Sequence, residues 1–105
     1  MFVKDKLESL LDMLKDAPNE PFILFALAQE CVKKGLDSEA LKYYERIITF
    51  SPEYTGVYYH MGKLLEQFGR MEDAILTYEK GMQMTSSKGE LHAYGELQSA
   101  LAMVQ

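Results

Sequence analysis

The sequence predicts an all-α fold of about six helices, arranged as antiparallel helix pairs. Apolar residues recur at intervals of three and four, which is the period of a helix that buries one face. No segment alternates apolar and polar residues as a half-buried strand would. Proline and glycine interrupt the periodic segments where helices end and the chain turns. The predicted helices lie near residues 2–16, 21–34, 38–50, 55–68, 72–84 and 88–103.

The first three predicted helices each carry a clear apolar stripe. Pro18 and Pro21 separate the first helix from the second. Gly35 separates the second from the third, because glycine takes the left-handed turn conformation without steric cost. Asp37 or Ser38 is the expected N-cap of the third helix. The stripes consist of Leu7, Leu10, Leu11 and Leu14, then of Leu24, Leu27, Ala28 and Cys31, and then of Ala40, Leu41, Tyr44, Ile47 and Ile48.

The last three predicted helices are bounded in the same way. Pro52 precedes the fourth helix, Gly69 follows it, and the stretch Ser86-Ser87-Lys88-Gly89 is expected to separate the fifth from the sixth. We expect the sixth helix to cover the end of the fold with an apolar stripe. That stripe consists of Leu91, Tyr94, Leu97, Leu101 and Val104.

The middle of the chain repeats itself with a period of 34 residues. When residues 21–54 are laid on residues 55–88, a turn glycine, a small residue early in the following helix and an aromatic residue four positions later coincide. Such a period is typical of proteins built from stacked supersecondary units. The identical pairs are Gly35 and Gly69, Ala40 and Ala74, Tyr44 and Tyr78, and Glu45 and Glu79.

These residues resemble the tetratricopeptide repeat, whose pattern is Trp-x-x-Leu-Gly-x-x-Tyr, then Ala-x-x-x-Phe/Tyr, then Pro. The matching residues are Leu24, Leu27, Ala28, Cys31, Ala40, Tyr44 and Pro52 in the first unit, and Tyr58, Met61, Gly62, Leu65, Ala74, Tyr78 and Ser86 in the second. Small bacterial proteins of this family are the expected relatives. The resemblance implies a right-handed superhelical stack of helix pairs, an α-solenoid.

The resemblance also implies a single domain over residues 1–105. Its parts are an N-terminal half-repeat helix at 1–18, repeats at 21–54 and 55–88, and a C-terminal capping helix at 88–105. The two outer helices are needed because two repeats alone fall short of the roughly three that a stable stack usually requires.

Residue size at matching positions predicts how the helices pack. Ala28 and Gly62 are small where the two helices of one unit should cross closely. Tyr44 and Tyr78 are large, and we expect them to fill the space between successive units. A bulky side chain at Gly62 would then overpack the crossing.

Charge and composition exclude several classes of function. The chain has 16 acidic and 11 basic residues and a net charge of −5, which repels a phosphate backbone, so we expect no nucleic acid partner. No basic amphipathic stretch and no apolar run near 20 residues is present, so we expect no membrane partner. The single cysteine, Cys31, rules out a disulfide within the chain and fits a cytoplasmic location.

The sequence does not predict an enzyme, a metal site or a cofactor. Cys31 lies on a buried stripe, whereas a reactive thiolate needs exposure and positive charge nearby. His92 and Glu96 can meet on one helix face, but a zinc site needs at least three protein ligands. Glu72 and Asp73 stand at a helix start, where carboxylates favour the helix dipole. No catalytic residue is therefore assigned.

The favoured function is an adaptor or scaffold that binds a protein or peptide partner in a concave groove. The first helices of successive units should line this groove, and aromatic residues there are typical of interfaces. An alternative for Phe25 and Tyr59 is packing against each other or against the last helix. The alternative function is a self-associating assembly protein, a possible homo-oligomer. The groove residues are Phe22, Phe25, Gln29, Lys33, Tyr59, His60, Lys63, Gln67 and Tyr94.

Overall fold

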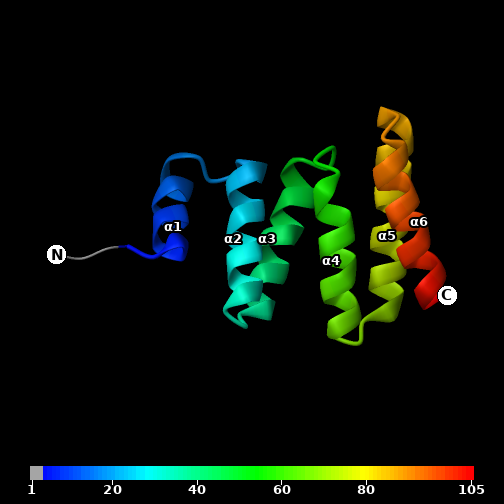
Figure 1. Ribbon diagram of the computed structural model, residues 1–105. Helices are drawn as coiled ribbons and strands as arrows, with labels where there is room; N and C mark the ends of the chain where they lie inside the picture. Colours follow the sequence, from blue (N-terminus) through cyan, green and yellow to red (C-terminus); the bar gives the residue numbers. More distant parts are fainter. Residues whose placement is uncertain (1–3) are drawn as a thin grey trace. The chain divides into compact units, whose positions relative to one another are not determined.

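The computed structural model describes residues 4–105, which form six α-helices and no strand (Figure 1). This confirms the predicted all-α helical-repeat fold class. None of the helices in this part of the chain combines the length and apolar character needed to cross a bilayer. The helices are α1 (Lys6–Asp16), α2 (Pro21–Lys33), α3 (Asp37–Phe50), α4 (Gly56–Gln67), α5 (Met71–Lys88) and α6 (Leu91–Val104).

The chain divides into two compact units, and each is described by itself. The first unit ends at Ser51 and contains α1, α2 and α3. The second unit runs from Pro52 to Gln105 and contains α4, α5 and α6. The single domain over 1–105 and its internal boundaries stay predictions of the sequence.

In the first unit, α2 packs against both α1 and α3. Leu10 of α1 forms a buried cluster with Ile23 and Leu27 of α2. Between α2 and α3, the ring centroids of Phe25 and Tyr44 lie 6.0 Å apart. Burial of this apolar surface is the main stabilisation of the unit.

In the second unit, α5 packs against α4 and α6, and α6 also contacts α4. Two helical glycines permit these close approaches. A Cβ atom added to Gly62 of α4 would lie 2.6 Å from Cζ of Tyr78 on α5. A Cβ added to Gly81 of α5 would lie 2.5 Å from Cβ of Tyr58 and 2.9 Å from Cδ1 of Leu97. The prediction that Gly62 marks a close crossing is confirmed.

The two tyrosines at matching positions pack within their own helix pair. Tyr78 lies over Gly62, and its hydroxyl donates to the carboxylate of Glu66 on α4. Tyr44 contacts Phe25 on its own partner helix. The sequence predicts that these rings lie between successive units. In the structure Tyr78 fills the crossing of its own pair, because the facing residue Gly62 is small, and Tyr44 packs against Phe25 of its own pair.

Gly35 and Gly69 turn the chain after α2 and α4. Gly35 and Gly69 have φ of 76° and 75°, in the left-handed region that the sequence predicts for them.

The predicted start of the first helix at residue 2 lies outside the described residues. The helix begins at Lys6, because the Asp5 side chain accepts the backbone N–H of Glu8 at 2.8 Å and caps the first turn.

The predicted N-cap of the third helix is wrong. Leu36 occupies the capping position and makes no side-chain cap, and α3 already includes Asp37 and Ser38. Asp37 and Glu39 lie in the first turn, where their negative charge favours the helix dipole instead.

The fifth helix is longer than the sequence predicts, ending at Lys88 rather than residue 84. The hydroxyls of Thr85 and Ser87 donate to helix carbonyls one turn back, each at 2.9 Å, so they are satisfied without leaving the helix. Ser86 replaces the proline that follows the corresponding helix of the first unit, and serine does not stop a helix. The turn falls at Gly89, with φ of 71°, and α6 consequently begins at Leu91 rather than residue 88.

Candidate peptide-binding groove

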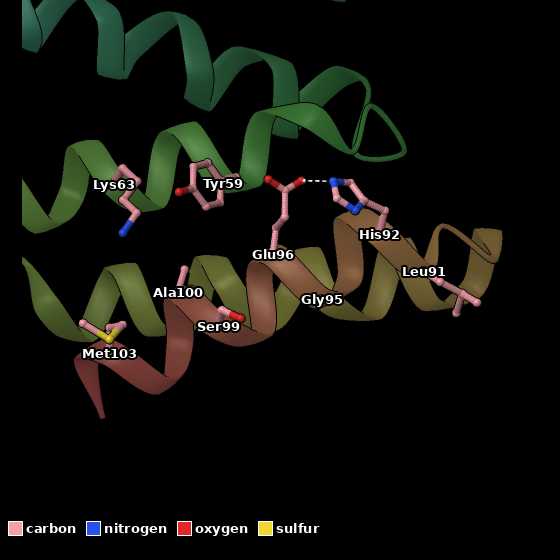
Figure 2. Close-up of a pocket in the computed structure, with 9 residues that line it drawn as sticks. All are labelled: Tyr59, Lys63, Leu91, His92, Gly95, Glu96, Ser99, Ala100 and Met103. Atoms are coloured by element: carbon pink, nitrogen blue, oxygen red, sulfur yellow. Dashed lines mark ion pairs between the residues drawn. The ribbon is translucent and has the colours of Figure 1, made fainter.

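A groove of about 560 Å³ runs between α4 and α6 in the second unit. Figure 2 shows its side chains: Tyr59 and Lys63 project from α4, and the facing wall belongs to α6. The volume lies within the range of natural ligand sites, which is about 300–1,000 Å³. The groove is therefore large enough to hold several side chains of a bound segment.

The α4 wall joins an aromatic ring to a positive charge. Lys63 lies one helical turn after Tyr59, and its Nζ stands 5.6 Å from the ring centroid, a cation–π distance. The same Nζ lies 3.7 Å from a carboxylate oxygen of Glu66. The ring of His60 meets that of Tyr59 edge-on, with centroids 5.7 Å apart. These contacts fix the orientation of the Tyr59 ring at the surface.

The α6 wall combines a polar centre with apolar ends. His92 Nε2 lies 3.5 Å from Glu96 Oε1, and the two form an ion pair when His92 is protonated. A Cβ atom on Gly95 would meet nothing within 4 Å, so this glycine leaves the groove open. Leu91 and Met103 stand at the two ends of the wall and are 80% and 81% exposed (Figure 2). Such large exposed apolar side chains are available for contact with a partner.

The electrostatics of the groove involve both helices. Desolvation lowers the pKa of His60 below its ordinary value, and the Glu96 carboxylate acts in the opposite direction. His60 belongs to α4 and Glu96 to α6, so the protonation of His60 on one wall depends on the Glu96 carboxylate of the other. The lowered pKa keeps His60 neutral near pH 7.

The structure brings together only some of the predicted groove residues. Tyr59 and Lys63 line the groove, and His60 contacts Tyr59 beside it. Gln67, the last residue of α4, is exposed and is not among the lining residues. Tyr94 lines a different depression, of about 330 Å³, between α5 and α6.

The other four predicted residues lie on α2 of the first unit. Phe22 is exposed, and Phe25 is partly buried against Tyr44. Gln29 is partly buried, and Lys33 pairs with Glu30 at 3.6 Å. The partner-binding role of all nine residues stays a prediction.

The residues of the α6 wall are not among the predicted groove residues. His92, Glu96, Ser99 and Met103 follow one another at intervals of four, three and four, which places them on one helix face. That spacing is visible in the sequence. Leu91 is assigned to the buried stripe by its period, yet it is exposed, because α6 begins at this residue.

Neither a cluster of metal ligands nor a reactive thiol is found among the described residues. Within residues 4–105, no three His, Cys, Asp or Glu side chains converge on a position that could hold a metal ion. Cys31 is buried, and its pKa is raised first by desolvation and then by the nearby Glu39 and Glu30 carboxylates. The thiol therefore stays protonated, the opposite of what a nucleophilic cysteine requires.

Solved structures resemble this chain over most of its length. A tetratricopeptide repeat domain protein from Salinibacter ruber is 40% identical, with a TM-score of 0.80 over 84% of this chain and 89% of that one. A protein from Bordetella parapertussis is 24% identical, with a TM-score of 0.81 over 97% of this chain and 89% of that one. The latter identity shows the fold alone.

A third likeness is to PcrH, crystallised in complex with the chaperone binding region of PopD. The TM-score is 0.85 at 12% identity, over 93% of this chain and 74% of that one, which again shows the fold alone. No curated protein sequence matches this chain at a significant level. The family model of the tetratricopeptide repeat matches residues 23–54 and 55–88, and the chain therefore belongs to the tetratricopeptide repeat family.

Proposed function

We propose that this protein is a protein–protein interaction module, and that the groove between α4 and α6 binds a peptide segment of a partner. The observation that carries the proposal is the pairing of an aromatic–cation wall on α4 with a wall on α6 whose apolar ends are exposed. Aromatic residues supply large contact area at small entropic cost, and exposed apolar side chains at a groove mark interaction sites.

The composition of the groove favours a short segment with mixed side chains. Leu91 and Met103 offer apolar contacts at the ends, and Met side chains adapt to different partners. Between them, the Lys63 ammonium and the Glu96 carboxylate stand on opposite walls. A segment that fits would carry apolar residues spaced around polar ones.

The likeness to PcrH gives independent support. In that crystal structure a protein with this fold holds a region of another protein, PopD. We propose the same general role for this chain, as an adaptor or scaffold that binds and does not catalyse. The buried thiol of Cys31 fits a reducing compartment, and we place this role in the cytoplasm.

A peptide selection tests the proposal directly. Peptides selected from a random displayed library on the wild-type protein are synthesised, and their Kd is measured by isothermal titration calorimetry. We expect Tyr59→Ala to raise Kd at least about tenfold, because truncating a central interface aromatic commonly costs more than ~1.4 kcal/mol. Lys63→Ala should raise it less.

Lys80→Ala is the matched control for charge. Lys80 is an exposed residue of α5 that does not line the groove, so its loss removes one positive charge without touching the site. Circular dichroism verifies that all variants fold. If the selected peptides bind Tyr59→Ala and Lys63→Ala as tightly as wild type, the groove is not the binding site.

A further inference from the structure

The groove between α4 and α6 carries two opposite charges, and they differ in how well the chain itself neutralises them. The Lys63 ammonium lies 3.7 Å from a carboxylate oxygen of Glu66, one turn along the same helix. Among residues 4–105, no lysine or arginine pairs with the Glu96 carboxylate, and its contact at 3.5 Å is with His92, which is charged only when protonated. While His92 is neutral, Glu96 therefore leaves an uncompensated negative charge in the groove.

The Tyr59 ring separates these two charges along the groove. Figure 2 shows Lys63 on one side of the ring, and on the other side the Glu96 side chain, which reaches across from α6. Lys63 Nζ stands 5.6 Å from the ring centroid, so the ring and Glu66 together hold the lysine at its own end. A positively charged group placed beside Glu96 would not have to displace Lys63 from these contacts.

The histidine of the α4 wall does not neutralise Glu96 near pH 7. His60 meets the Tyr59 ring edge-on, and desolvation lowers its pKa below the ordinary value, with the Glu96 carboxylate acting in the opposite direction. The ring is therefore neutral near pH 7. The chain as a whole carries a net charge of −5, so its field also favours a cationic segment over an anionic one.

The space beside Glu96 suits a long side chain. Gly95 precedes Glu96 on α6, and a Cβ atom there would meet nothing within 4 Å. Leu91 lies one helical turn before Gly95 and is 80% exposed. Lysine and arginine lay their methylene stems along apolar surface and keep the charged group at a polar one. Leu91 and the open space at Gly95 can receive such a stem, with the charged group at Glu96.

We propose that the groove selects peptide segments that carry an arginine or a lysine, and that Glu96 recognises this basic side chain. This role of Glu96 rests on the proposed function, because the same groove holds the segment. The basic group forms an ion pair with the Glu96 carboxylate, and its stem packs over Gly95 and Leu91. Arginine is favoured over lysine, because its planar guanidinium can donate two parallel hydrogen bonds to one carboxylate.

Two parallel selections from a random displayed peptide library test the preference, one on the wild-type protein and one on Glu96→Lys. We expect the wild type to enrich peptides that share an arginine or lysine, and Glu96→Lys to lose that preference. A wild-type peptide is then synthesised with its basic residue and with glutamine in its place. Isothermal titration calorimetry on the wild type should give a Kd about five- to tenfold higher for the glutamine peptide.

A double-mutant cycle locates the contact. On Glu96→Gln the basic peptide and the glutamine peptide should bind equally, because the charge that distinguishes them is gone. Glu79→Gln is the matched control, since Glu79 is an exposed carboxylate of α5 that does not line the groove. It loses the same charge, yet the full difference between the two peptides should persist. Circular dichroism verifies that both variants fold.

The outcomes distinguish a failure of this role from a failure of the proposed function. Peptides that lose affinity on Tyr59→Ala but share no basic residue would overturn the role of Glu96 and leave the groove as the binding site. A basic peptide that keeps its advantage on Glu96→Gln, or loses it equally on Glu79→Gln, would also overturn that role. If no selected peptide depends on Tyr59, the proposed function fails, and the recognition of a basic side chain fails with it.

Discussion

Substituting Gly62 by alanine tests the packing of the second unit most directly. The new methyl group would lie 2.6 Å from Cζ and 2.7 Å from Cδ1 of Tyr78, whereas ordinary van der Waals contact begins near 3.4 Å. The Tyr78 ring is fully buried, and its hydroxyl is bonded to Glu66. The ring cannot retreat without opening the core and stretching that hydrogen bond.

The magnitude follows from three opposing effects. Overpacking a well-packed core costs about 1–3 kcal/mol, and this contact is close enough for the upper end. Loss of the hydrogen bond to Glu66 adds about 1 kcal/mol. Replacing a glycine by alanine in a helix interior stabilises the folded chain by about 1 kcal/mol. The variant should be less stable by about 3 kcal/mol, which lowers Tm by roughly 12–24 °C for a chain of this size.

Gly95→Ala is the matched control for this measurement. Gly95 is also a helical glycine of the second unit, but a Cβ there would meet nothing within 4 Å. Only the gain in helix propensity applies, so Tm should rise by a few degrees, about 4 °C. Thermal unfolding followed by circular dichroism measures both variants. A Gly62→Ala variant at least as stable as wild type would refute the close crossing of α4 and α5.

Close packing at Gly81 and the titration of Tyr44 and His60 give three further predictions. Gly81→Ala should destabilise by about 1–3 kcal/mol in urea unfolding, because its methyl would lie 2.5 Å from Cβ of Tyr58, an atom too near the backbone to move aside. The free energy of unfolding should fall as pH rises above about 10. Burial raises the pKa of Tyr44 from 10.0 to about 12, so the unfolded chain loses that proton at a lower pH than the folded chain does. Urea midpoints that coincide at pH 8 and pH 11 would contradict this prediction. The pKa of His60, followed by NMR, should lie below 6.5 and fall further in Glu96→Gln, because that carboxylate favours the protonated ring.

The repeat signature made most of the fold predictable from the sequence. Proline and glycine at matching positions set the helix ends, because each has a definite effect on the backbone: Pro52 cannot continue a helix, and Gly35 and Gly69 turn it back. The prediction failed where that chemistry was absent. At Ser86 a hydroxyl residue replaces the proline, and α5 continues for another turn.

The extra turn of α5 explains why the predicted groove residues include those of α4 but not those of the α6 wall. The register of α4 follows from the repeat, so Tyr59 and Lys63 could be placed on its open face. α6 follows a longer α5, and its register no longer follows from the period of 34 residues. The sequence predicts Tyr94 in the groove, whereas His92 and Glu96 line it and Tyr94 lines the depression between α5 and α6. Only the packing of α6 against α4 and α5 determines which face of α6 lines the groove and which lines the depression between α5 and α6.

Matching residues of α4 and α6 differ in how far the neighbouring helices cover them. Tyr58 and Tyr94 have the same position in their helices, but a second helix covers only Tyr58. α6 therefore presents two open faces, one to the groove through His92 and Glu96 and one to the depression through Tyr94.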